Sequence, residues 1–281
     1  MGGIAALLTL TSCATLGGGS AEKPLPASIV KELKEAKTIA VLGYNSSKGL
    51  DDRLLNDAIK APLFELKLEI VDERGIKFPI ESRIESYEKD LLSKLAKGPY
   101  KLVDKNKVLA AGSYKAIKGD VTSDLNNVNA AKGYALTYKF DNFMDNAQSG
   151  SNANKVPAVG QVINNFKDAL NELGADLGII VVEKPYVKVK RYAIIPYQLI
   201  YKMKDFFGVT AQTTYYIVKP STLNQVLYSK TINTTSDTTY ILKGYTEEQR
   251  KTDQTTFLEQ YDTVSKRTHD EFIKWLTEQI Q

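Results

Sequence analysis

The side chains that most often carry catalysis are scarce in this sequence. Its 281 residues include one histidine and one cysteine. A Ser-His-Asp arrangement needs a histidine that moves a proton between nucleophile and substrate. The only histidine, His269, lies in KRTHDEF, and we interpret it as a solvated residue on the polar side of a helix. A His-rich metal site and an internal disulfide are excluded by the same counts.

The remaining candidates for catalysis are carboxylates and one glycine-containing turn. Asp51 and Asp52 are adjacent, and adjacent side chains on a helix do not face each other, so we expect them to favour a helix start rather than to act as an acid–base pair. GYNSSKG lacks the Gly-Lys-Ser/Thr ending of a phosphate loop and is predicted to be a turn. We therefore predict no catalytic residue, no metal site and no cofactor.

The composition predicts a folded globular protein. Apolar residues make up 43% of the chain and charged residues 25%, which excludes a disordered or collagen-like chain. The net charge of +4 arises from 37 basic and 33 acidic residues that are interspersed. This excess is too small to predict a nucleic-acid partner.

The stretch LTLTSC ends a short apolar run at the single cysteine, Cys13. The run from Ile4 to Leu10 is shorter than the roughly 20 residues of a bilayer span and has the length of a signal-peptide core. Leu10-Thr11-Ser12-Cys13 resembles the lipobox of bacterial lipoproteins. The resemblance implies that residues 1–12 are a signal peptide and that Cys13 becomes the lipidated, palmitate-bearing first residue. We expect the leader to begin upstream, because its first residues carry no Lys or Arg.

Flexible residues follow the cysteine. Gly17-Gly18-Gly19-Ser20 and two nearby prolines predict a tether, which a lipid anchor requires and a core helix does not. We assign residues 13–36 to this tether and a short helix, and residues 37–281 to a single α/β domain. Ala14 stands where an aspartate would favour the inner membrane, so the resemblance implies the outer membrane of a bacterial cell envelope.

Hydrophobic periodicity predicts an α/β domain, with a mixed sheet and packed helices. The expected strands are residues 38–44, 66–71, 100–104, 134–140 and 177–183, and the expected shorter helices are residues 28–37, 51–59, 82–97 and 162–173. A polar stretch near residues 141–158 predicts a loop insertion. The chain from Tyr186 to Ile232 is predicted to be all-β, with a closing antiparallel hairpin.

Two helices have clear apolar stripes. For the first, Ser82 is the expected N-cap and Glu85 completes a capping box; its stripe is Ile84, Tyr87, Leu91 and Leu95. The second is a long amphipathic helix from about Glu247 to Ile280, with a stripe of Phe257, Tyr261, Val264, Phe272 and Leu276. We expect the long helix to pack on its own domain rather than on a partner.

Four segments resemble the TolB amino-terminal and curli-channel (CsgG-like) superfamily. TIAVLGY resembles its opening strand, and YKLVDKNKVLAA its second strand and helix start, with Lys105 where arginine is usual. LNELGADLGIIVVE resembles its helix, turn and central strand, and YYIVKPSTLNQVLYSKTI its closing hairpin. These motifs are structural and carry no catalytic residue. In the curli-channel family, the region between central strand and closing hairpin includes a membrane-inserting hairpin.

The segment from residue 184 to 208 interleaves lysines and an arginine with aromatic residues. Such a pattern can bind single-stranded nucleic acid, which an envelope lipoprotein rarely meets. It can also form a transmembrane hairpin, but YAIIPYQLIY does not alternate cleanly and Pro196 would interrupt a paired strand. We favour an extra β-excursion with lysines on its edges, used for partner binding. The candidate contact residues are Tyr186, Lys190, Arg191, Tyr192, Tyr197, Tyr201, Phe206 and Phe207.

Together these features predict a lipid-anchored envelope lipoprotein that acts as a non-catalytic binding or assembly module. Its expected partners are the membrane, through Cys13, and an envelope protein or a second copy of the chain. The alternative is an oligomeric secretion or pore subunit of the curli-channel type. A hydrolase that uses carboxylates alone is the least supported alternative.

Overall fold

The computed structural model describes most of the predicted domain. The described residues are 25–47, 80–117, 128–134, 166–194, 202–220, 226–237, 240–241 and 246–281. The predicted leader, Cys13 and most of the tether lie outside them. So do the helix expected at 51–59, the strand expected at 66–71 and the loop expected near 141–158.

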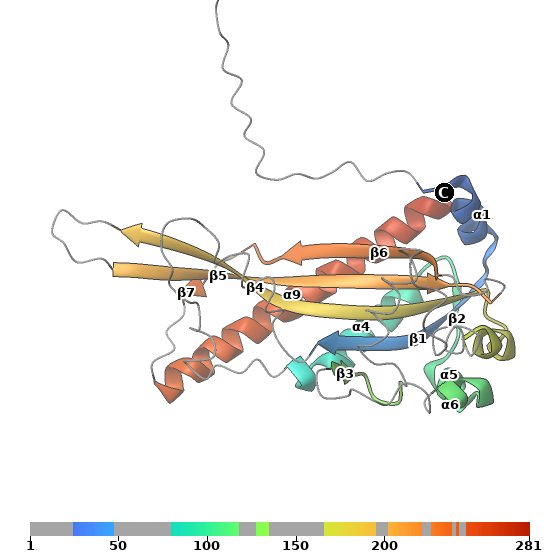
Figure 1. The fold of residues 1–281 in the computed structure, drawn as a ribbon, viewed down its shortest axis with the longest axis horizontal. Coiled ribbons are helices and arrows are strands. Elements are labelled where there is room, and N and C mark those ends of the chain that lie inside the picture. The colour runs from blue at the N-terminus through green and yellow to red at the C-terminus, as the bar shows by residue number, and fades with distance from the viewer. Residues whose placement is uncertain are drawn as a thin grey trace, which may run out of the picture.

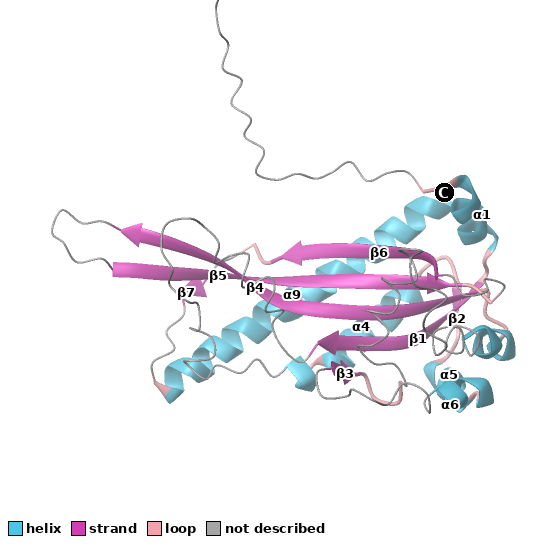
Figure 2. Cartoon of the chain, viewed as in Figure 1, coloured by secondary structure: helices cyan, strands magenta, loops and turns pink. Residues whose placement is uncertain are grey.

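A mixed sheet forms the centre of the domain (Figures 1 and 2), as the α/β prediction requires. Its five main strands lie in the order β2 (Lys101–Leu102), β1 (Thr38–Ser47), β4 (Leu177–Ile194), β5 (Lys202–Val218) and β6 (Val226–Thr235). β1 is parallel to both β2 and β4, whereas β4, β5 and β6 are antiparallel. Two short strands join the sheet: β3 (Val128–Ala130) pairs with β1, and β7 (Tyr240–Ile241) with β5.

Helices pack against this sheet. They are α1 (Ala27–Glu35), the turn η1 (Ile80–Ser82), α4 (Ile84–Leu95), α5 (Lys105–Ala110), α6 (Gly112–Ile117), residues 166–173 and α9 (Glu247–Ile280). α9 crosses the sheet diagonally and contacts β5, β6 and α4 (Figure 1). On the described part of the chain, no helix combines the length and the apolarity that a membrane crossing requires.

The long final helix has the predicted bounds. Thr246 accepts a hydrogen bond from the Gln249 N–H, and the Gln249 side chain accepts one from the Thr246 N–H, so a capping box fixes the helix start. Its five predicted stripe residues are all buried. Trp275 stacks on Tyr228 of β6 with 5.5 Å between ring centroids. The predicted packing of this helix on its own domain is confirmed.

The prediction for the start of α4 is partly wrong. Its four stripe residues are buried as expected. However, Ser82 lies in η1 and the helix begins at Ile84, after Arg83, without a side-chain cap. Glu85 accepts a hydrogen bond from the backbone N–H of Lys132 instead of closing a capping box. A contact 47 residues away in the chain has therefore replaced the local one.

Only the first residue of the strand expected at 134–140 is described, so that prediction stays untested beyond Tyr134. Tyr134 follows a turn and lies outside any strand, and the rest of that segment is beyond the described residues. β3 lies a few residues earlier, where its three residues pair with Asn45, Ser46 and Ser47 at the end of β1. A strand of three residues carries too little alternation to be recognised from sequence.

β4 and β5 continue as a ribbon beyond β1 and β6, and among the described strands only the two residues of β7 pair with it (Figure 1). β1 pairs with β4 only as far as Glu183, and β6 pairs with β5 only as far as Thr210. β4 and β5 stay paired to Ile194 and Lys202. At ~3.3 Å per residue, the ribbon from Tyr186 to Ile194 is about 26 Å long. The all-β prediction is confirmed for the described part of this region.

Candidate functional site

A fully buried carboxylate, Glu183, lies on β4 at the point where β1 stops pairing with it. The hydroxyl of Tyr44 on β1 donates to Glu183 Oε2, and the hydroxyl of Tyr261 on α9 donates to Oε1. A buried carboxylate is costly unless such donors surround it. Burial, followed by the nearby carboxylate, raises the pKa of both phenols well above the usual value. Tyr44 and Tyr261 therefore keep the protons that they donate.

His269 connects this group to α4. Its Nε2 lies 3.1 Å from the Tyr44 hydroxyl, and its Nδ1 lies 2.8 Å from Asp90 Oδ2. The prediction of a solvated His269 is wrong, because α9 turns this side of the helix onto the sheet and the residue has no exposed surface. Phe272 lies three positions after His269 in the sequence, and Tyr261 lies eight positions before it. This helical spacing to two stripe residues is the signal that could have identified a buried position.

The outer end of the network fastens α4 to α9. Lys94 Nζ lies 2.9 Å from Asp90 Oδ2 and 2.7 Å from Asp270 Oδ1, and it donates to the Lys266 carbonyl. Partial burial alone would raise the pKa of Asp90. Hydrogen bonds to His269 and Lys94 outweigh that effect and hold this pKa below its usual value. Asp90 therefore remains ionised in the folded protein near neutral pH.

The order Asp90–His269–Tyr44 resembles a catalytic relay, in which a carboxylate orients a histidine beside a hydroxyl. Two observations give it a different role. The Tyr44 hydroxyl already donates to Glu183, and Tyr44 has no exposed surface between the sheet and α9. A substrate would have to displace α9 to reach it. The arrangement is therefore suited to joining β1, β4, α4 and α9. Sequence reasoning missed Glu183, because it is the last residue of LGIIVVE and no local pattern marks it as buried.

Lys105, at the start of α5, makes a second polar contact. Lys105 Nζ lies 2.8 Å from the carboxylate of Glu88, which is buried on α4, and 4.7 Å from the centroid of the Tyr134 ring. This pairing attaches the start of α5 to α4. Among the described residues, no group of three or more His, Cys, Asp or Glu side chains is arranged to hold a metal ion.

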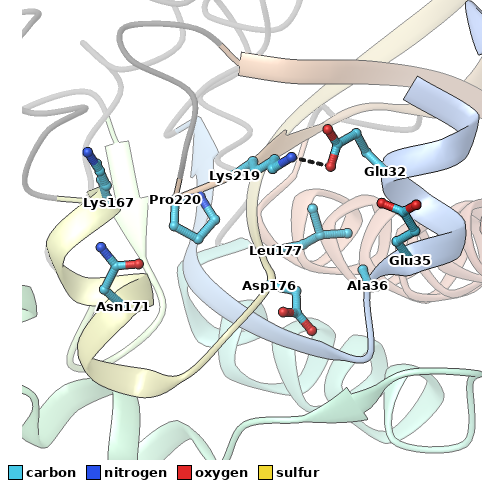
Figure 3. A pocket seen from close by; sticks show the side chains of 9 residues that line it. All are labelled: Glu32, Glu35, Ala36, Lys167, Asn171, Asp176, Leu177, Lys219 and Pro220. Atoms are coloured by element: carbon cyan, nitrogen blue, oxygen red, sulfur yellow. Dashed lines mark hydrogen bonds and ion pairs between the residues drawn. The ribbon is translucent and has the colours of Figure 1, made fainter. Parts of the chain in front are cut away.

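An open pocket of about 580 Å³ lies where α1, residues 166–173 and the end of β5 meet (Figure 3). Its lining residues are Glu32, Glu35, Ala36, Lys167, Asn171, Asp176, Leu177, Lys219 and Pro220. Lys219 pairs with Glu32. Asp176 accepts hydrogen bonds from the N–H groups of Lys37, at 2.8 Å, and Thr38, at 2.9 Å. These contacts hold α1 and β1, and the mixture of charges matches no single class of ligand.

The predicted contact residues are placed by backbone register alone. Six of them lie on β4 or β5, and Tyr197 and Tyr201 lie outside the described residues. The described ones are Tyr186, Lys190, Arg191, Tyr192, Phe206 and Phe207. The register pairs Lys190 with Phe206, Tyr192 with Lys204 and Arg191 with Asp205. Cationic and aromatic positions therefore oppose each other along the ribbon.

No protein-family model matches this chain, and no curated protein matches it significantly. The likeness of its four segments to the TolB amino-terminal and curli-channel superfamily is therefore an expectation from sequence.

Proposed function

We propose that this protein is a bacterial envelope lipoprotein, lipid-anchored at Cys13 to the outer membrane, that acts as a non-catalytic binding or assembly module. The observation that carries the proposal is the β4–β5 ribbon, which continues beyond the sheet and contains most of the basic and aromatic segment. Among the described residues, Glu183 and His269 are by contrast fully buried inside the domain.

The ribbon is suited to a protein partner through its free edge. Among the described strands, β4 has a neighbour on both sides up to Glu183 and on one side only beyond it. The backbone of that edge can pair with an added strand. The ribbon from residue 184 to 205 contains six Lys or Arg residues at described positions and one Asp, Asp205. This excess of positive charge favours an acidic partner surface.

The position of α1, the first described helix, is compatible with this role. α1 lies at the end of the sheet opposite the tip of the ribbon (Figure 1). Residues 14–24 extend about 40 Å at most, because a chain reaches at most ~3.6 Å per residue. β4 from Leu177 to Ile194 is about 56 Å long at ~3.3 Å per residue. An anchored domain can therefore present the tip of its ribbon far from the membrane surface.

A pore subunit of the curli-channel type is the second candidate, and the length of the ribbon favours it. A transmembrane β-strand needs about 9–11 residues that alternate in polarity. In the register, Arg191 opposes Asp205, and it shares its face of the ribbon with Val189 and Ala193. Arginine on a lipid face near the bilayer centre costs about 2–4 kcal/mol. Charged residues at these ribbon positions favour partner binding over membrane insertion. No observation on the described residues favours a carboxylate-based hydrolase.

The anchor is tested by mass spectrometry of the full-length protein recovered from bacterial membranes, beside Cys13→Ala. The proposal predicts a lipid-sized mass increase on a chain that begins at Cys13, absent from the variant. An unmodified chain that retains residues 1–12 would contradict it.

The binding role is tested by cross-linking and affinity capture from the same membranes. The double variant Lys188→Glu/Lys190→Glu reverses two charges on the ribbon, and Lys89→Glu on exposed α4 surface is the matched control. We expect the double variant to lose its captured partner and the control to keep it. Equal capture by both would contradict the proposal, and permeabilisation of liposomes by the acylated protein would favour the pore subunit.

A further inference from the structure

A row of polar residues crosses three neighbouring strands beneath α9. The register places Ser46 of β1 beside Glu183 of β4, and Glu183 opposite Thr213 of β5. All three are fully buried. Residues that are aligned in this way share one face of the sheet. Glu183 contacts Tyr261 of α9, so this face is the one that α9 covers.

The hydroxyls on both sides of Glu183 have no hydrogen-bond partner among the described residues. They are Ser46 Oγ and Thr213 Oγ1. The buried Ser265 hydroxyl on α9 also has no hydrogen-bond partner among the described residues. Ser265 lies one helical turn after Tyr261 and one before His269, so it is on the side of α9 that faces the row. Three buried hydroxyls from three elements thus lie where α9 covers the row that contains Glu183.

Buried hydroxyls without partners are rare in native proteins, and ordered water is their usual partner. Glu183 can accept more than it receives from protein. A carboxylate has about four lone-pair sites, whereas Tyr44 and Tyr261 donate one hydrogen bond each. A water molecule beside Glu183 would have the carboxylate as acceptor and hydroxyl groups as further partners, which satisfies the two to four contacts that a buried water needs.

We infer that this row is an internal water-binding site, in which water bridges Glu183 to the hydroxyls of Ser46, Thr213 and Ser265. The bound water extends the network from α4 as far as β5. A hydrogen-bonded path then runs from Lys94 at the surface, through Asp90, His269 and Tyr44, to Glu183 and across the sheet. α9 is docked at this point through a hydrated polar contact, with apolar packing on either side.

The site is tested directly by a crystal structure of the wild-type protein at a resolution that shows ordered water. We expect density for water at about 2.5–3.0 Å from a Glu183 carboxylate oxygen and from Ser46 Oγ or Thr213 Oγ1. Hydroxyls that bond directly to protein atoms, or an unhydrated row, would overturn the inference.

The sign of a stability change provides an independent test. Thr213→Val keeps the side-chain shape and removes the hydroxyl. If water bridges Thr213 to Glu183, the unfolding equilibrium constant of Thr213→Val should be about tenfold higher than that of the wild type. The reason is that the variant loses a hydroxyl that hydrogen-bonds, through water, to the carboxylate. If the Thr213 hydroxyl has no partner, Thr213→Val should stabilise the protein. An unfolding equilibrium constant that is unchanged or lower in the variant would therefore overturn the inference. Thr214→Val is the matched control. Thr214 is only partly buried and already bonds to Thr231, with 3.0 Å between the Oγ1 atoms.

Discussion

The same two strands, β4 and β5, behave differently at their two ends. At the base, Glu183 and Tyr215 are fully buried beneath α9, and Tyr215 stacks on Phe272 with 3.8 Å between ring centroids. Towards the tip, the described sheet narrows to two strands and the two residues of β7. The base contains titratable groups with defined partners, and the ribbon contains cationic and aromatic positions. This contrast is the basis for assigning stability to the buried network and for proposing the ribbon as a binding surface.

If this contrast is correct, changes at the base should reduce stability, and changes on the ribbon should reduce binding alone. The largest effect is expected for Glu183→Ala. It removes the acceptor of two buried phenols, and each buried donor left without a partner costs about 1–3 kcal/mol, so the expected total is about 2–6 kcal/mol. Urea unfolding should show a lower midpoint with an unchanged slope.

The matched control is Glu183→Gln, which keeps the volume and one acceptor oxygen. Its free energy of unfolding should fall by less, about 1–3 kcal/mol. Wild-type stability in Glu183→Ala would show that the network does not hold α9 to the sheet.

Tyr261→Phe should lower the free energy of unfolding by less than Glu183→Ala does. The variant keeps the ring packing and removes one hydrogen bond to a carboxylate, which contributes about 1.5–3 kcal/mol. Tyr100→Phe is the control, because the Tyr100 hydroxyl donates to a neutral acceptor, the Leu33 carbonyl, at 2.8 Å. Its expected loss is about 1 kcal/mol. A larger loss in the control than in Tyr261→Phe, measured by urea unfolding, would contradict the central place of Glu183.

Asp90→Asn should have a pH-dependent effect of about 0.5–1 kcal/mol, because Asp90 is partly exposed and solvent screens its contacts. The pKa of Asp90 is lowered in the folded protein. Its contribution is therefore present above the unfolded pKa of ~3.9 and is lost as the pH falls through the folded pKa. Stabilities of wild type and variant, measured by urea unfolding across pH, should differ at pH 7 and converge in acid. A gap that widens on acidification would contradict this assignment.

The smallest effect on stability is expected on the ribbon. Lys190→Glu lies beyond the pairing of β1 and β6, so the free energy of unfolding should change by less than about 0.5 kcal/mol. Thermal unfolding of the purified protein measures this change. A loss comparable with that of Tyr261→Phe would mean that the ribbon is part of the folded core, and the contrast between base and tip would fail.

The parts that sequence predicts well are those with local causes. The stripes of α4 and α9 follow from helical periodicity, and both are buried as expected. The apolar run at the start of β4 predicts a strand covered on both faces, and residues 177–183 are all buried.

The parts that sequence missed depend on contacts between distant segments. Glu183 is buried because register aligns it with Ser46 and Thr213, and α9 supplies Tyr261 from 78 residues further along the chain. The charged neighbours of His269 favour a solvent-side position, whereas its helical spacing to Tyr261 and Phe272 matches the buried stripe. The contacts of His269 with Tyr44 and Asp90 come from distant segments and have no local signal.

The central claim, that the ribbon is the binding surface of an anchored module, is tested most directly by site-specific photo-cross-linking in bacterial membranes. A photoreactive residue is placed at position 190 of the full-length protein, and at position 89 on exposed α4 surface as the control. The account predicts a protein adduct, to an envelope protein or to a second copy, at position 190 and none at position 89. Adducts at position 89 alone, or lipid adducts alone at position 190, would contradict it.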